Sequence, residues 1–255
     1  MNVYVSGLIW VVSAVVAGAV VAYSVRRFGP DEGREDNNTA AGQAYTIVGG
    51  LHAVVVAFVL ISLFDAVSTV RDDAYTEARA LVTATWAADA LPAPVPARMR
   101  ALASDYANTV ADQEWPSLRA GTPVPNTGWT QLDQMRALID SAPVSSDDDW
   151  LENRKTEASD DLLDVYDARQ QRLNADADNQ VGAVLWFVLA VGSLLFVLLP
   201  NLFGGTRLVP HVIIVSTLAG TTALLCFAIF QLQNPFAGGA QVGPDAFTQA
   251  LARLG

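Results

Sequence analysis

Reactive side chains are scarce in this 255-residue chain, which contains one cysteine, one lysine and two histidines. A single cysteine excludes an intrachain disulfide. So few thiols and imidazoles leave little material for general acid–base or nucleophilic catalysis. The sequence contains no HExxH motif, no CxxC motif and no phosphate-binding loop. We therefore expect a protein that is not an enzyme and that uses no cofactor and no bound metal.

Charged residues are also few, at 16% of the chain, and they are missing from four long apolar runs. The runs cover residues 3–25, 46–64, 181–203 and 208–232. Each run reaches the roughly 18–20 residues that are needed to cross a bilayer core. This pattern excludes a soluble enzyme, a disordered chain and a nucleic-acid-binding protein. It predicts an all-α integral membrane protein with four transmembrane helices in contact with lipid.

The spacing of the four runs divides the chain into transmembrane hairpins and an extramembrane domain. We expect a first hairpin over residues 1–68, with helices over about 3–25 and 46–66, joined by a loop over 28–45. An acidic helical domain follows over residues 69–180, a second hairpin over 181–233, and a tail with a short amphipathic helix over 234–255. The domain holds 20 Asp and Glu against 10 Lys and Arg. Such a surface repels nucleic acid and offers no basic cluster to anionic lipid.

Periodicity, prolines and caps predict the helices of the acidic domain. Apolar residues continue at helical spacing beyond the second run, which predicts one long helix that ends near Ala90. Pro116 is expected to end the next helix at Trp115. The last helix is expected to be capped by Ser145 and Ser146 and to continue directly into the third membrane helix. The helices after the long one are thus expected over about residues 97–114, 129–141 and 147 onward.

Four spans place both termini and the helical domain on one side of the membrane. Basic residues follow the first membrane helix, at Arg26 and Arg27, and none precedes it. By the positive-inside rule this favours short loops inside the cell and termini outside.

The second membrane helix carries two ionisable residues, His52 and Asp65. Placing such a side chain in lipid costs roughly 2.5–3.5 kcal/mol on insertion scales. Their positions differ by 13, so the two lie about 140° apart around a helix. The His52 face continues through Val56, Val59 and Leu63, and the Asp65 face includes Phe58 and Ile61. His52 fits either a pore or a bond to a neighbouring helix, and Asp65 fits an interfacial position better than a pore.

The acidic domain contains an aromatic corner at Glu114, Trp115 and Pro116. A tryptophan beside a proline is typical of a packed structural corner. Glu114 is expected either to cap a helix or to pair with an arginine such as Arg169 or Arg172.

Several short segments, in this order, resemble the bacterial bestrophin-like domain family, a family of unknown function. They include residues 45–50 (YTIVGG), 77–81 (EARAL), 114–116 (EWP), 168–173 (ARQQRL), 184–186 (VLW), 235–238 (PFAG) and 242–247 (VGPDAF). The residues that carry this resemblance are Glu77, Glu114, Trp115, Pro116, Arg169, Arg172, Trp186, Pro235, Phe236 and Gly238. The resemblance covers about residue 45 to the C-terminus. It departs at Gly182-Ala183, because a typical member has a proline before the Leu-Trp pair of the third helix.

The family is named for its similarity to bestrophins, which are pentameric anion channels whose second membrane helix lines the pore. The resemblance therefore implies a homo-oligomeric channel, with a pentamer as the expected form, in the plasma membrane of a bacterium. It implies a pore lined either by the His52 face or by the Phe58 and Asp65 face, and termini inside the cell. An acidic domain at the pore mouth would concentrate cations, which conflicts with an anion channel. The alternative function is an accessory or scaffold subunit that binds a protein partner through the acidic domain.

Overall fold

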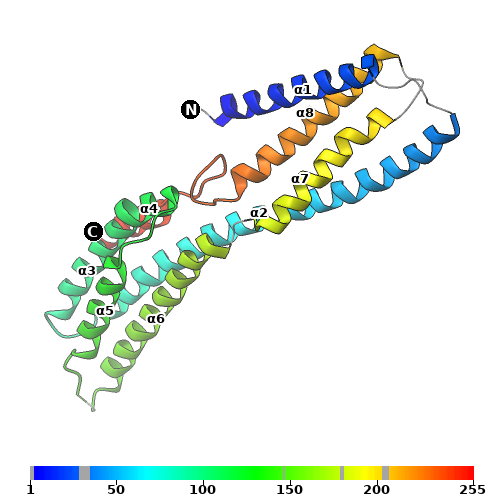
Figure 1. The fold of residues 1–255 in the computed structure, drawn as a ribbon. Coiled ribbons are helices and arrows are strands. Elements are labelled where there is room, and N and C mark those ends of the chain that lie inside the picture. The colour runs from blue at the N-terminus through cyan, green and yellow to red at the C-terminus, as the bar shows by residue number, and fades with distance from the viewer. Residues whose placement is uncertain (1–2, 29–34, 146, 179–180, 203–206) are drawn as a thin grey trace. The chain divides into compact units, whose positions relative to one another are not determined.

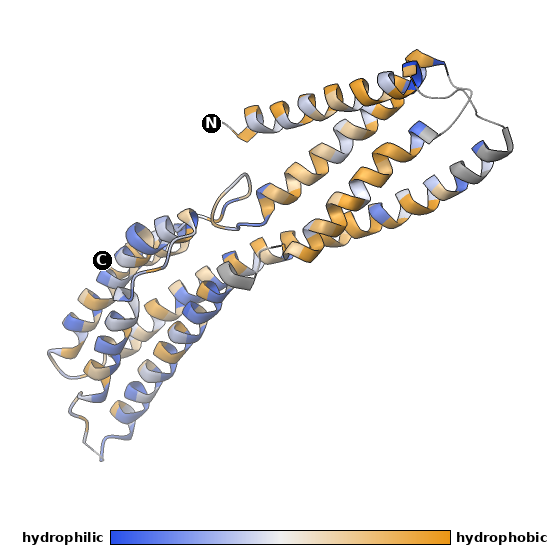
Figure 2. Cartoon of the chain, viewed as in Figure 1, coloured by the Kyte–Doolittle hydropathy of each residue, from blue (hydrophilic) through white to orange (hydrophobic). Residues whose placement is uncertain are grey.

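The computed structural model describes residues 3–28, 35–145, 147–178, 181–202 and 207–255, and these residues form helices and connecting segments without a strand (Figure 1). Contacts divide the chain into two compact units. The membrane unit contains residues 1–64 and 181–233, and the helical unit contains residues 65–180 and 234–255. Figure 2 shows the difference in hydropathy between them, because apolar residues dominate the helices of the membrane unit.

The membrane unit contains four helices that are long and apolar enough to cross a bilayer, as the sequence predicts. They are α1 (Val3–Phe28), the first part of α2 (Glu35–Ala88), α7 (Ala183–Leu198) and α8 (Leu208–Leu232). The α-helical part of the third span is shorter than expected, because α7 passes into a 3₁₀ turn, η2 (Leu199–Leu202). Pro200 lies in this turn and cannot donate the backbone hydrogen bond of a continuing α-helix.

Small residues allow α1 and α8 to pack closely along each other, as Figure 1 shows. A Cβ atom on Gly18 would lie 2.8 Å from the Cβ of Ala219, and one on Gly220 would lie 2.6 Å from the Val15 side chain. Helix association in lipid depends on such close backbone approach, because apolar burial gives little driving force there.

Helix α2 is one continuous helix from Glu35 to Ala88, so the prediction of a long helix that leaves the apolar run is confirmed. Its beginning was predicted wrongly, because the expected loop over residues 28–45 is helical from Glu35 onward. Good helix formers such as Ala40, Ala41 and Gln43 explain this earlier start.

The first part of the helical unit corrects the prediction for Trp115 and Pro116. Helix α3 (Val95–Thr109) is followed by a π-helical turn, η1 (Val110–Glu114), and then by α4 (Trp115–Ala120). The chain therefore stays helical beyond Trp115. Pro116 falls in the first turn of α4, where a missing backbone donor costs little. Gly121 ends α4 with a positive φ of 63°, which favours glycine.

The next two helices are α5 (Thr127–Asp140) and α6 (Asp149–Asp178). The Oδ1 of Asp148 accepts a 3.1 Å hydrogen bond from the backbone N–H of Leu151, so Asp148 caps the start of α6. Ser145 was expected in that role, but the hydrogen bond that its Oγ accepts comes from Asp147, before the helix. The other expected cap, Ser146, lies outside the described residues. The single lysine, Lys155, donates to the carbonyl oxygens of Asp140 and Ala142 at the end of α5.

Helices α6 and α7 are separate, so the prediction of one continuous helix is wrong. Helix α6 ends at Asp178, and α7 begins at Ala183. Gly182 has a ψ of 153°, an extended conformation that interrupts a helix.

The C-terminal tail forms the expected turn and the expected short helix. The side-chain oxygen of Asn234 accepts hydrogen bonds from the backbone N–H groups of Phe236 and Ala237. Pro244 then precedes α9 (Asp245–Leu254), whose apolar side contacts α3.

Candidate functional site

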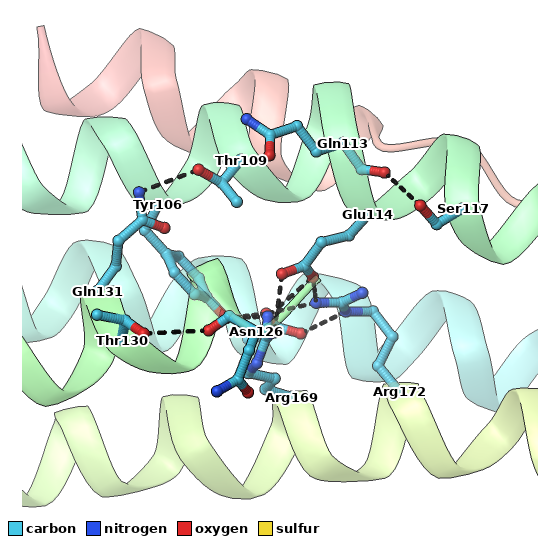
Figure 3. Close-up of polar contacts among 11 residues, drawn as sticks. Tyr106, Thr109, Gln113, Glu114, Ser117, Asn126, Thr130, Gln131, Arg169 and Arg172 are labelled. Carbon is cyan, nitrogen blue, oxygen red and sulfur yellow. Dashed lines mark hydrogen bonds and ion pairs between the residues drawn. The ribbon is translucent and has the colours of Figure 1, made fainter. Parts of the chain in front are cut away.

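Four charged side chains meet in the core of the helical unit, and all four are fully buried. Glu77 comes from α2 and Glu114 from η1, while Arg169 and Arg172 lie three residues apart on one face of α6. Figure 3 shows Glu114 facing Arg169 and Arg172, with dashed lines to both. Two carboxylates and two guanidinium groups give this charge cluster a net charge of zero.

Glu114 bridges the two arginines. Its Oε2 accepts hydrogen bonds from Arg169 Nη1 at 2.8 Å and from Arg172 Nη2 at 3.0 Å. Its Oε1 forms an ion pair with Arg169 Nη2 at 2.8 Å, but the angles at these two atoms are not those of a hydrogen bond. Arg172 also binds Glu77 with two donors, Nε at 2.6 Å and Nη2 at 3.0 Å. The paired hydrogen bonds to Glu77 give the geometry that an arginine–carboxylate pair prefers.

Tyr106 of α3 joins the charge cluster through its hydroxyl group. This group donates a hydrogen bond to Glu77 and accepts one from Arg169 Nη1 at 3.3 Å. Burial and the negative charge of Glu77 raise the pKa of Tyr106 well above its ordinary value. The phenol therefore remains protonated and keeps donating to Glu77.

Aromatic rings cover the faces of both guanidinium groups. The Cζ of Arg169 lies 4.6 Å from the ring centre of Trp129, and the Cζ of Arg172 lies 5.2 Å from Trp115 and 5.6 Å from Phe247. Such cation–π contacts favour a desolvated cation. Arg169 Nε and Arg172 Nη1, which make no hydrogen bond to a described residue, belong to these two guanidinium groups.

Arg172 keeps its positive charge despite burial. Burial alone would lower the pKa of Arg172, but the charge of Glu77 and its hydrogen bond outweigh that effect and raise the pKa. The cluster is therefore a set of ion pairs that joins α2, α3, η1 and α6. These ion pairs and hydrogen bonds connect four helical elements, so the cluster has a structural role in this unit.

Gly128 leaves no room for a side chain beside the charge cluster. A Cβ atom at this position would lie 2.6 Å from both Nη atoms of Arg169 and would also clash with Glu114 Oε1. We therefore expect Gly128→Ala to destabilise the helical unit by roughly 1–3 kcal/mol, the usual cost of overpacking. Thermal unfolding of the full-length protein measures this loss. Gly50→Ala is the matched control, because nothing lies within 4 Å of a Cβ atom there. Equal stability of the two variants would contradict the expectation.

The structure brings most of the residues of the expected structural motif together. Trp115 donates from its Nε1 to the backbone carbonyl of Val242 at 2.9 Å. Its ring centre lies 5.5 Å from that of Phe236, and the carbonyl of Pro235 accepts a 2.8 Å bond from the N–H of Val242. These contacts attach the tail to η1 and α4.

Three residues of the motif take no part in these contacts. Pro116 and Gly238 are exposed on the helical unit, and Gly238 has a positive φ of 87°. Trp186 belongs to the membrane unit, where its Nε1 donates to Gln233 Oε1 at 3.2 Å.

Sequence reasoning missed four members of this site: Tyr106, Gly128, Trp129 and Phe247. Tyr106 and Phe247 occupy apolar faces of amphipathic helices, so periodicity assigns them to the core without showing their polar neighbours. The Gly128-Trp129 pair at the start of α5 was the available signal, because a glycine inside a helix often marks a close contact.

The membrane part of α2 has a buried face and an exposed face. Val56, Val59 and Leu63 are only 5–6% exposed. His52, on the same side, has its Nε2 3.3 Å from the Oγ of Ser193 on α7. It also packs against Gly192, where a Cβ atom would lie 2.6 Å from its Nδ1.

The opposite face of α2 carries the other expected pore residues. Phe58 is 68% exposed and Ile61 is 58% exposed. Asp65 is exposed as well and makes no ion pair with a described residue. Among the residues that the structure describes, no group of three or more His, Cys, Asp and Glu could hold a metal ion.

Four apolar helices, with a helical insertion between the second and third, define an α-helical membrane protein. The family model for the Bestrophin-like domain matches residues 12–247, and the chain belongs to this family. It is also similar to a solved structure, a point mutant of a bacterial bestrophin homologue from Klebsiella pneumoniae, with a TM-score of 0.68. That match covers 100% of this chain and 98% of the other at 12% identity, so it shows a shared fold. Comparison with curated proteins finds no match.

Proposed function

We propose that this protein is a homo-oligomeric ion channel in the plasma membrane of a bacterium and that the exposed face of α2 lines its pore. The observation that carries the proposal is the division of α2 into two faces. One face is buried against the rest of the chain, and the other exposes Phe58, Ile61 and Asp65. An exposed face of a membrane helix meets either lipid, another copy of the chain or water.

The positions around α2 place Asp65 on the same side of the helix as Phe58. At 100° per residue, Asp65 lies about 20° from Phe58, whereas Val56, Val59 and Leu63 lie about 100–160° from it. Asp65 directly follows the apolar run 46–64 and is the first residue of the helical unit, so its carboxylate lies at the end of the span. Asp65 would therefore face water if copies of α2 surround a common axis.

The other expected pore face is engaged inside the chain. His52 contacts Ser193 and Gly192 of α7, and the three apolar residues that follow it on this side are buried. Contacts of this kind hold α2 against its neighbours within one subunit. We therefore assign the pore to the Phe58 side.

The proposed number of copies rests on similarity alone. Bestrophins are pentamers, and the fold shared with a bacterial bestrophin homologue supports a ring of five subunits for this chain. Trp86 and Trp150 of the helical unit are 52% and 61% exposed, which is unusual for tryptophan and fits contacts between subunits. The second candidate function is a scaffold subunit. In that case the same two side chains would contact a different protein instead of another copy of the chain.

The native mass of the protein in lipid nanodiscs separates the two functions. A discrete pentamer supports the channel, whereas a monomer with a stoichiometric foreign partner supports the scaffold. A monomer or dimer cannot surround a central pore and would overturn the channel.

Ion flux through reconstituted protein tests the pore face. We expect Phe58→Ala to change the conductance several-fold, because apolar constrictions control water and ion passage. Phe64→Ala is the matched control, because Phe64 is 59% exposed on the same helix but lies about 120° from Phe58. An equal effect of both substitutions, or none of either, would contradict this assignment.

A further inference from the structure

A cavity of about 240 Å³ opens between α2 and α9 within the helical unit. Its polar wall consists of Tyr75, Thr76 and Arg79 from α2 and Gln249 and Arg253 from α9. Alanine and valine side chains form the rest of the lining. The Nε2 of Gln249 donates to the hydroxyl oxygen of Tyr75 at 3.3 Å, which links the two helices at the cavity.

The charge at this cavity is unbalanced. No Asp or Glu is among its lining residues, and neither Arg79 nor Arg253 makes an ion pair with a described residue. Arg100 and Arg136 of the same unit pair with Asp89 and Asp140, whereas Arg71, Arg98 and Arg119, like the two cavity arginines, make no ion pair with a described residue. Two cations at one cavity repel each other, and an anion between them would remove that repulsion.

The shortage of partners is notable because the unit is strongly acidic. Residues 69–180 hold 20 Asp and Glu, so carboxylates are plentiful elsewhere on its surface. Asp72 and Asp245 lie about one turn before Thr76 and Gln249 on their helices, but neither lines the cavity. Arg79 and Arg253 are both exposed and have no carboxylate partner among the described residues of one chain, so an anion from outside the chain can reach them.

We propose that this cavity binds a small organic oxyanion, a metabolite that carries a phosphate or carboxylate group. Guanidinium groups bind both kinds of oxyanion through paired N–H donors. The Tyr75 and Thr76 hydroxyl groups and the Gln249 amide add neutral donors, and the alanine and valine lining accepts an apolar part of the ligand. This site goes beyond the proposed function, because binding here requires neither conduction nor a pore.

Thermal unfolding of the full-length protein in nanodiscs tests the proposal, with inorganic phosphate and succinate as separate probes. We expect at least one probe to raise the Tm by about 2–4 °C in a saturable way, compared with chloride at equal ionic strength. The probe that raises the Tm shows whether the cavity recognises a phosphate or a carboxylate group. No saturable shift with either probe would overturn the proposal.

Three variants locate the binding. Arg79→Gln and Arg253→Gln are expected to lose the shift, and Arg136→Gln, an exposed arginine outside the cavity, is expected to keep it. Arg253 lies in the last turn of α9 and is exposed, so its substitution leaves the core unchanged. Equilibrium dialysis with labelled phosphate or succinate measures the same loss directly. A shift that survives both cavity substitutions would place the binding elsewhere and overturn the proposal.

Discussion

Replacing Glu114 by alanine is expected to lower the free energy of unfolding of the helical unit by about 3–5 kcal/mol. The change removes the carboxylate that bridges the buried arginines. Arg172 keeps its bond to Glu77, but Arg169 loses its carboxylate partner and remains buried with an uncompensated charge. Because a domain is stable by only about 5–15 kcal/mol, this loss is a large share of the total. Thermal and denaturant unfolding followed by circular dichroism measure it.

Asp112→Ala provides the control for Glu114→Ala. Asp112 lies in the same turn and is exposed, so its substitution removes one negative charge without touching the charge cluster. A surface change of this kind usually alters stability by less than about 0.5 kcal/mol. Glu114→Gln keeps the size of the side chain and is expected to fall between the two. If Glu114→Ala and Asp112→Ala unfolded at the same temperature, the cluster would not be a major source of stability.

The helices that cross the membrane were predictable because composition decides them. An uncharged run has few alternatives to a helix in a bilayer, because its backbone groups must form hydrogen bonds within the protein. The predicted bounds of α8, residues 208–232, agree with the structure. Helix ends outside the runs were less predictable. A proline after Trp115 was expected to end a helix, but the π-helical turn before it shifts the backbone register, and Pro116 falls where its missing donor is harmless.

For the candidate sites too, the local sequence pattern predicts some residues, whereas contacts between distant parts of the chain decide others. The pairing of Glu114 with Arg169 or Arg172 was expected from the sequence as one of two alternatives, and the structure contains both pairs. The role of Tyr106 was not accessible, because its partner Glu77 lies 29 residues earlier in the chain. Periodicity also separated the two faces of α2, but only the fold shows which of them packs inside the chain.

Charge reversal at Asp65 is expected to reverse the ion preference of the proposed channel. In a ring of copies, Asp65 would place one negative charge per subunit at the same level of the pore. Two unit charges 4 Å apart interact by about 1 kcal/mol in water and by about 4 kcal/mol at an effective dielectric constant of 20. Several such charges would favour cations by a factor of about ten or more. We therefore expect the wild-type channel to prefer cations and Asp65→Lys to prefer anions.

Reversal potentials under a salt gradient measure this preference, and Asp65→Asn should give an intermediate value. Asp105→Lys is the control, because Asp105 is exposed on α3 and the substitution changes the net charge of each subunit by the same amount. If both lysine variants shifted the reversal potential equally, the selectivity would come from the overall charge of the acidic unit. An unchanged reversal potential in Asp65→Lys would instead remove this residue from the pore. A shift confined to Asp65→Lys would identify the exposed face of α2 as the surface that ions pass, because a charge facing lipid or a subunit contact would not act on permeating ions.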